Sequence, residues 1–102
     1  MKIKEGASIQ GLDIRMRPAL IVADRIWKEL GQELVVTSGL DGEHSAGSLH
    51  YYGRAVDFRT RYFNEREVAD AKLFLSRALG PDFDVILHST HIHVEYDPVK
   101  PR

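Results

Sequence analysis

The last part of the chain has two histidines and a glutamate at alternate positions, in the run His91-Ile92-His93-Val94-Glu95-Tyr96. Alternation of polar and apolar residues is typical of a half-buried strand. Side chains two residues apart on a strand point to the same face, so both imidazoles and Glu95 share the polar face, with about 7 Å between the two histidine positions. Taken alone, this pattern also fits a solvated strand that contains two histidines by chance.

A second group of polar residues lies earlier in the chain. In the stretch Ser48-Leu49-His50-Tyr51-Tyr52-Gly53-Arg54-Ala55-Val56-Asp57, an imidazole precedes a carboxylate by seven residues. On one continuous strand this odd spacing would send His50 and Asp57 to opposite faces, so a turn must intervene, and Gly53 is the natural place for it. With that turn, His50 folds back towards Asp57.

These residue types predict a metal site. Two imidazole nitrogens and one carboxylate oxygen form a zinc site of the catalytic kind, which has three protein ligands and leaves the fourth position to water. Structural zinc sites usually have four protein ligands, often cysteines, and this chain has no cysteine. The lack of cysteine also excludes disulfides, iron–sulfur sites and thiol nucleophiles. The sequence therefore predicts one Zn²⁺ ion.

The two stretches together form a long ordered motif: Ser48-x-His50-x-x-Gly53-x-Ala55-x-Asp57, followed by His91-x-His93. This motif resembles the zinc D-Ala-D-Ala carboxypeptidase family, which shares the hedgehog/DD-peptidase fold with lysostaphin-type endopeptidases and the hedgehog signalling domain. The resemblance runs from about Thr37 to Tyr96. It implies a zinc metallopeptidase that hydrolyses a peptide bond involving a D-amino acid in bacterial peptidoglycan stem peptides, as a D-Ala-D-Ala carboxypeptidase or a phage-type endopeptidase does.

Carried over residue by residue, the resemblance implies that His50, Asp57 and His93 bind the zinc ion. His91 would then lie beside the bound water and the scissile carbonyl, where it assists proton transfer or stabilises the tetrahedral intermediate. Zinc lowers the pKa of bound water to about 7 and polarises the carbonyl, and histidine can carry protons near neutral pH. Glu95 is the reserve candidate for the base, or it orients His93.

The chain departs from the family at two places. Some family members use an acidic residue three positions before the last ligand, where this chain has Thr90. Many relatives carry an arginine shortly after the strand that ends near Ser38-Gly39, where it holds a substrate carboxylate or the oxyanion, but this chain has Leu40-Asp41 there. Three side chains could take its place, and the choice among them stays open: His44, Arg54 and Arg59.

Several other polar residues are weaker candidates. Ser48 is expected to support a ligand or the loop rather than act as a nucleophile, and Glu43 and His44 either line the cleft or simply belong to the loop. His88 is expected to point away from the metal or to lie beneath a hairpin, in a structural role. A catalytic triad of Ser48, His50 and Asp57 would leave His91 and His93 without a role. The Gly-x-Ser-x-Gly sequence of such serine hydrolases is also absent.

The elements that must position these residues follow from periodicity. Apolar residues at helical spacing predict one helix over 19–30 and another after Asn64, with a capping box to Glu67 at its start and Gly80-Pro81 at its end. Strands are predicted at four places: 34–37, 54–59, 84–88 and 91–96. The last two are close enough for a hairpin. The predicted fold is α+β, with a small, largely antiparallel sheet, helices on one face and the zinc site on the other.

Length and charge limit the remaining choices. A chain of 102 residues suits a single domain over 1–102, with a flexible tail from about residue 97. The net charge of −1 disfavours nucleic-acid binding. No apolar run has the length of a signal peptide or a membrane span. We therefore expect synthesis in the cytoplasm, no membrane partner and, for a phage-type enzyme, action on the cell wall after release.

The expected partner of the enzyme is a peptidoglycan peptide or another D-amino-acid peptide. Two other functions remain open. One is a non-catalytic zinc-binding recognition module, since the hedgehog domain shows that this fold can keep the metal and serve recognition. The other is a cytoplasmic D-Ala-D-Ala dipeptidase. The sequence leaves the bond cleaved and the oligomeric state open.

Overall fold

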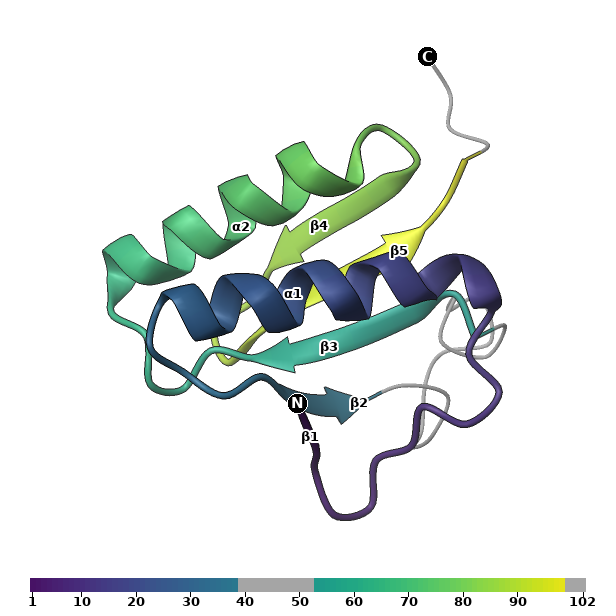
Figure 1. Cartoon of the computed structure of the whole chain (residues 1–102), viewed down its shortest axis with the longest axis horizontal. Coiled ribbons are helices and arrows are strands. Elements are labelled where there is room, and N and C mark those ends of the chain that lie inside the picture. The colour runs from purple at the N-terminus through teal and green to yellow at the C-terminus, as the bar shows by residue number, and fades with distance from the viewer. Residues whose placement is uncertain (39–52, 99–102) are drawn as a thin grey trace.

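The computed structural model describes residues 1–38 and 53–98. This part of the chain forms a five-stranded sheet with two α-helices that lie together over one face (Figure 1). The elements in chain order are β1 (Lys2–Ile3), the 3₁₀ helix η1 (Ile14–Met16), α1 (Arg17–Glu29), β2 (Val35–Ser38), β3 (Ala55–Arg59), α2 (Glu65–Leu79), β4 (Phe83–Leu87) and β5 (His91–Tyr96). Among the described residues, neither helix has the length and apolar character to cross a bilayer.

The sheet is mixed, with the strand order β1-β2-β3-β5-β4. β1 runs parallel to β2, and the other pairings between neighbours in this order are antiparallel. The predicted α+β class is therefore confirmed for the described residues, and the predicted hairpin of β4 and β5 is confirmed as well. The parallel β1 was not predicted, because a strand of two residues is too short to show a periodic pattern.

Local signals set the ends of both helices. α1 has Pro18 in its first turn, where a missing N–H costs no hydrogen bond. Gly31, just after the end of α1, has a φ of +82°, which is typical of the glycine that ends a helix. α2 starts with a reciprocal capping box, in which the Glu67 amide donates to Asn64 Oδ1 at 2.8 Å and the Asn64 amide donates to Glu67 Oε1 at 3.0 Å. The predicted capping box is confirmed, and it fixes where α2 begins after β3.

The core lies between the helices and one face of the sheet. Val56 pairs with Val94 and Phe58 with Ile92 across β3 and β5, and all four side chains are fully buried. Trp27 of α1 is buried in this core and packs edge-on against Phe58, with 5.8 Å between ring centroids. Burial of each large apolar side chain contributes about 1.5–3 kcal/mol, so this layer holds β3 and β5 in register.

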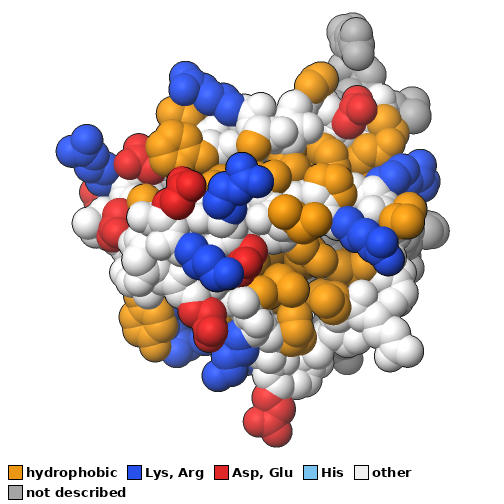
Figure 2. Space-filling view, viewed as in Figure 1, with side chains coloured by type: hydrophobic (Ala, Val, Ile, Leu, Met, Phe, Trp, Pro, Cys, Tyr) orange, Lys and Arg blue, Asp and Glu red, His pale blue; other side chains and the backbone are white. Residues whose placement is uncertain are grey.

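The alternation along β3 and β5 then decides where the polar residues lie. Because successive side chains of a strand point to opposite faces, the residues between the core positions face away from the helices. Figure 2 shows the helix-covered side, where charged side chains surround apolar ones and no histidine is visible. The chemistry-bearing residues of β3 and β5 therefore belong to the other face, called here the open face.

Gly53 forms the turn that leads into β3, as predicted. Its φ is +70°, a conformation that glycine adopts without steric cost. A Cβ at this position would lie 2.6 Å from the carbonyl oxygen of Gly11, and the Asp13 amide donates to the Gly53 carbonyl at 2.8 Å. The glycine of the motif thus allows the segment before η1 to pack closely against the start of β3.

Candidate metal centre

The open face brings together residues from β3 and β5 that are far apart in the sequence. The register of these antiparallel strands places Asp57 opposite His93 and Arg59 opposite His91. Directly opposite side chains on one face have Cβ atoms about 4.5–5.5 Å apart. The Asp57 carboxylate and the imidazoles of His91 and His93 therefore lie side by side on two neighbouring strands.

Asp57 and His93 are in direct contact across β3 and β5. His93 Nδ1 donates a hydrogen bond to Asp57 Oδ1 at 2.8 Å. The side chain of His93 is only 15% exposed and that of Asp57 only 13%, so water screens their interaction weakly. Two of the three predicted ligands thus meet through atoms that can both bind a metal ion.

Glu95 holds the other ring nitrogen of His93, since His93 Nε2 donates to Glu95 Oε1 at 2.7 Å. Burial of the imidazole works to lower its pKa, but the hydrogen bonds to Asp57 and Glu95 outweigh burial and raise the pKa of His93 above its usual value of 6.5. An imidazole with a carboxylate on each nitrogen is stabilised in its protonated form. Of the two roles predicted for Glu95, the contact favours orientation of His93.

His91 lies on the other side of Asp57. Its Nε2 is 3.9 Å from Asp57 Oδ1, which is longer than a hydrogen bond. Its Nδ1 shares a hydrogen bond with Thr90 Oγ1 at 3.0 Å. The side chain is 28% exposed, about twice the exposed fraction of His93. His91 is therefore the more accessible of the two imidazoles.

His88 joins this group, and the prediction that it points away from the site is wrong. Its ring stacks on His91 with 4.7 Å between centroids and lies edge-on to His93 at 6.3 Å. The His88 amide also donates to the His91 carbonyl at 2.9 Å. The physical reason is the hairpin register: Leu87 pairs with Ile92, so residue 88 lies opposite residue 91 on the same face and only Ser89 and Thr90 turn the chain. That register was the signal that could have found it.

The remaining predicted site residues lie outside the described residues: Glu43, His44, Ser48 and His50. The chain before them is described as far as Ser38, which is the register partner of Asp57 in β2. The chain after them resumes at Gly53. The role of His50 as a third ligand therefore stays a prediction.

The donors that are described suit zinc. Imidazole nitrogen and carboxylate oxygen are both common zinc ligands, and two donors of one tetrahedral zinc ion lie about 3.3 Å apart. The separation of 2.8 Å between His93 Nδ1 and Asp57 Oδ1 is within about 0.5 Å of that value. A histidine that binds a metal through one nitrogen usually donates its other N–H to a carboxylate or carbonyl, which is what Glu95 provides for His93.

A separate group of acidic side chains lies at the C-terminal end of β5. One carboxylate oxygen from each of Asp84, Glu95 and Asp97 lies within 4.8 Å of the others, so this triad could hold a metal ion. Carboxylate oxygens alone favour hard cations such as Ca²⁺ and Mg²⁺ rather than zinc. The Asp97 amide also donates to the Asp82 carbonyl at 2.8 Å.

No known protein-family model matches the chain. The case for a function therefore depends on the side chains of the open face and on the motif that contains them.

Proposed function

We propose that this protein is a zinc-dependent peptidase that cleaves a peptide bond involving a D-amino acid in peptidoglycan stem peptides. The observation that carries the proposal is the contact between Asp57 and His93, which joins positions 36 residues apart at 2.8 Å. Support for the reaction comes from His91 beside the same carboxylate. The substrate class comes from the resemblance of the motif to zinc D-Ala-D-Ala carboxypeptidases.

In this proposal His50, Asp57 and His93 hold the ion, and Glu95 fixes the tautomer of His93. With its proton on Nε2 and donated to Glu95, the His93 ring presents the Nδ1 lone pair on the side of Asp57. Zinc, when bound, supplies an acidified water and a Lewis acid for the scissile carbonyl.

His91 is the proposed proton carrier. Hydrolysis of a peptide bond needs a proton on the leaving amine, and an imidazole is suited to deliver one near neutral pH. The hydrogen bond between Thr90 and His91 Nδ1 holds the ring, and Nε2 lies on the Asp57 side. His91 can therefore act next to the metal ligands without being one of them.

The test combines zinc content with hydrolysis of purified peptidoglycan and of D-Ala-D-Ala. We expect turnover by the zinc-loaded protein and loss of turnover on chelation. His91→Ala should keep its zinc and lose most activity, because general acid–base groups contribute about 10²–10⁴-fold, whereas Asp57→Ala should lose both. Glu29→Ala, an exposed position on α1, serves as the matched control and should retain both.

Two results would contradict the proposal. Stoichiometric zinc without turnover on any stem peptide would indicate a recognition module instead of an enzyme. Turnover that is indifferent to chelators would exclude the metal mechanism. Mass analysis of the products from muropeptide digestion identifies the bond and distinguishes a carboxypeptidase from an endopeptidase.

A further inference from the structure

We propose that two copies of this protein associate through β4, which pairs with β4 of the second copy in antiparallel fashion and joins the two sheets into one. β4 is the last strand in the order β1-β2-β3-β5-β4, so within the described part of the chain only β5 pairs with it. Figure 1 shows β4 at the outer side of the sheet, next to α2. An edge strand presents N–H and C=O groups that another strand can bind. The inference concerns assembly and does not depend on the proposed peptidase activity.

The hydrogen bonds of the hairpin show which backbone groups of β4 face outwards. The His88 amide donates to the His91 carbonyl at 2.9 Å, so residue 88 bonds towards β5. In an antiparallel ladder, alternate residues of a strand direct both of their backbone groups to the same side. The even-numbered residues of this strand therefore bond to β5. Three odd-numbered residues direct their backbone groups away from it: Phe83, Val85 and Leu87.

Antiparallel pairing about a two-fold axis at Val85 satisfies these outward groups. The Val85 residues of the two copies then exchange both backbone hydrogen bonds, and the Leu87 amide of each copy donates to the Phe83 carbonyl of the other. The Phe83 amide is not needed for this pairing, because it already makes a long contact of 3.4 Å with the Gly80 carbonyl. The pairing uses the same surface of both copies, which is the commonest kind of dimer contact.

The side chains of β4 are compatible with this register. Ile86 and Leu87 are large apolar side chains that are 41% and 43% exposed, and the second strand covers part of both. On the open face, Asp84 of one copy lies opposite Ile86 of the other, so the two Asp84 carboxylates do not face each other. The register therefore covers apolar surface and avoids a direct repulsion between like charges.

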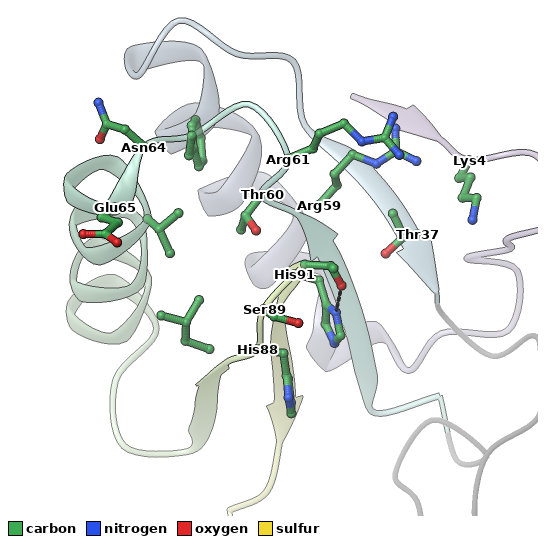
Figure 3. Close-up of a pocket in the computed structure, with 14 residues that line it drawn as sticks. Lys4, Thr37, Arg59, Thr60, Arg61, Asn64, Glu65, His88, Ser89 and His91 are labelled. Carbon is green, nitrogen blue, oxygen red and sulfur yellow. Dashed lines mark hydrogen bonds between the residues drawn. The ribbon is translucent and has the colours of Figure 1, made fainter.

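Asp82 and His88 supply the charge complementarity that indicates a second copy rather than an unrelated strand. They flank β4 at its two ends, and both are exposed. In the register centred on Val85, Asp82 of each copy lies opposite His88 of the other, where an imidazole N–H can donate to the carboxylate. Figure 3 shows His88 next to His91 at the end of the hairpin. Asp82 of the second copy would thus lie close to the proposed proton carrier.

The opposite edge of the described sheet lacks these features. β1 has only two residues, Lys2 and Ile3, and Lys4 follows it. Short edge strands, lysines and prolines are features that prevent edge-to-edge pairing. The segment 82–88 contains no lysine, arginine or proline. Of the two described edges, β4 is therefore the one suited to pair with a further strand.

The test is sedimentation equilibrium of the full chain. For a small interface we expect a reversible dimer with a dissociation constant of about 1–100 μM. Ile86→Glu places a like charge opposite Asp84 of the other copy, whereas Ile86→Lys places an opposite charge there. We expect the dimer of Ile86→Glu to be at least about fivefold weaker than that of Ile86→Lys. Ile21→Glu, at a position of α1 that is 63% exposed, is the control and should dimerise like the wild type.

A second variant tests the backbone pairing itself. Leu87→Pro removes an outward amide, a change that an edge strand tolerates, and should weaken the dimer at least about tenfold through two lost hydrogen bonds. Circular dichroism checks its folding, and if it does not fold, the two Ile86 variants decide.

Three results would overturn the proposal. The first is a wild type that stays monomeric at concentrations well above the expected dissociation constant. The second is equal dimerisation of Ile86→Glu and Ile86→Lys, or a folded Leu87→Pro that dimerises like the wild type. The third is growth beyond two copies, because a two-fold contact closes at the dimer.

Discussion

Substitution of Glu95 tests whether this carboxylate orients His93 for metal binding. Glu95→Gln keeps the size of the side chain and an acceptor oxygen but removes the charge. A hydrogen bond to a charged group contributes about 1.5–3 kcal/mol and a neutral one about 0.5–1.5 kcal/mol, so the substitution costs about 1 kcal/mol. Glu95 is only 20% exposed, so water reduces this difference little, and about 1 kcal/mol corresponds to a fall in zinc affinity of about fivefold. Glu95→Ala removes the contact and should lower zinc affinity about 10- to 100-fold.

The assay is a competition for zinc between the protein and a chromophoric chelator at constant pH and salt. Two controls accompany it. Asp84→Asn removes a charge from the acidic group that includes Glu95 and should change zinc affinity less than about threefold, since Asp84 is not a proposed ligand and salt screens charges that do not contact the ion. Glu29→Gln on α1 should change nothing. Unchanged affinity in Glu95→Ala would refute the orienting role, and an equal loss in Asp84→Asn would place the metal in the acidic group instead.

Three further predictions follow. Because the pKa of His93 is raised by folding, this group stabilises the metal-free protein below about pH 6.5, and that stabilisation is lost as pH rises through the higher pKa of the folded state. Zinc affinity should rise over the same interval, since His93 must lose a proton to bind the ion. Gly53→Ala should lower the free energy of unfolding by about 2–4 kcal/mol, from its positive φ and the collision with backbone, whereas Gly31→Ala, with open space around it, should cost about 1 kcal/mol. Thr90→Val should reduce kcat about 5- to 10-fold through the lost hydrogen bond to His91, with zinc content unchanged.

Each of these outcomes has a direct measurement. Thermal unfolding of the chelated wild type and of His93→Gln between pH 5.5 and 8 checks the prediction for His93. The same pH dependence of stability in both proteins would contradict it. Denaturant unfolding of the two glycine variants checks the second, which fails if they lose equal stability. A pH–rate profile of Thr90→Val checks the third, and loss of zinc by this variant would contradict the assigned contact.

Most of the fold could be predicted from the sequence because its elements carry local signals. The capping box at Asn64 and the alternation in β5 depend only on neighbouring residues, so the predicted bounds of the helices and strands lie within two residues of those observed. β1 could not be predicted, since Lys2 and Ile3 form a strand only by pairing with β2.

The site was less predictable, because it depends on register between distant strands. Alternation predicted that Asp57 and His93 lie on polar faces, but only the pairing of β3 with β5 places them opposite each other. The stacking of His88 on His91 depends on the hairpin register, and the contact of Arg54 with Asp13 depends on how the segment before η1 packs against β3. Neither contact has a local signature.

The central claim is that side chains from separate stretches hold one zinc ion. Elemental analysis of purified wild-type protein and of His50→Ala, Asp57→Ala and His93→Ala, with Glu29→Ala as control and folding checked by circular dichroism, tests it most directly. We predict about one zinc per chain in the wild type and the control, and loss of zinc with lower thermal stability in each of the three ligand variants. Full zinc content in Asp57→Ala or His93→Ala would contradict the account.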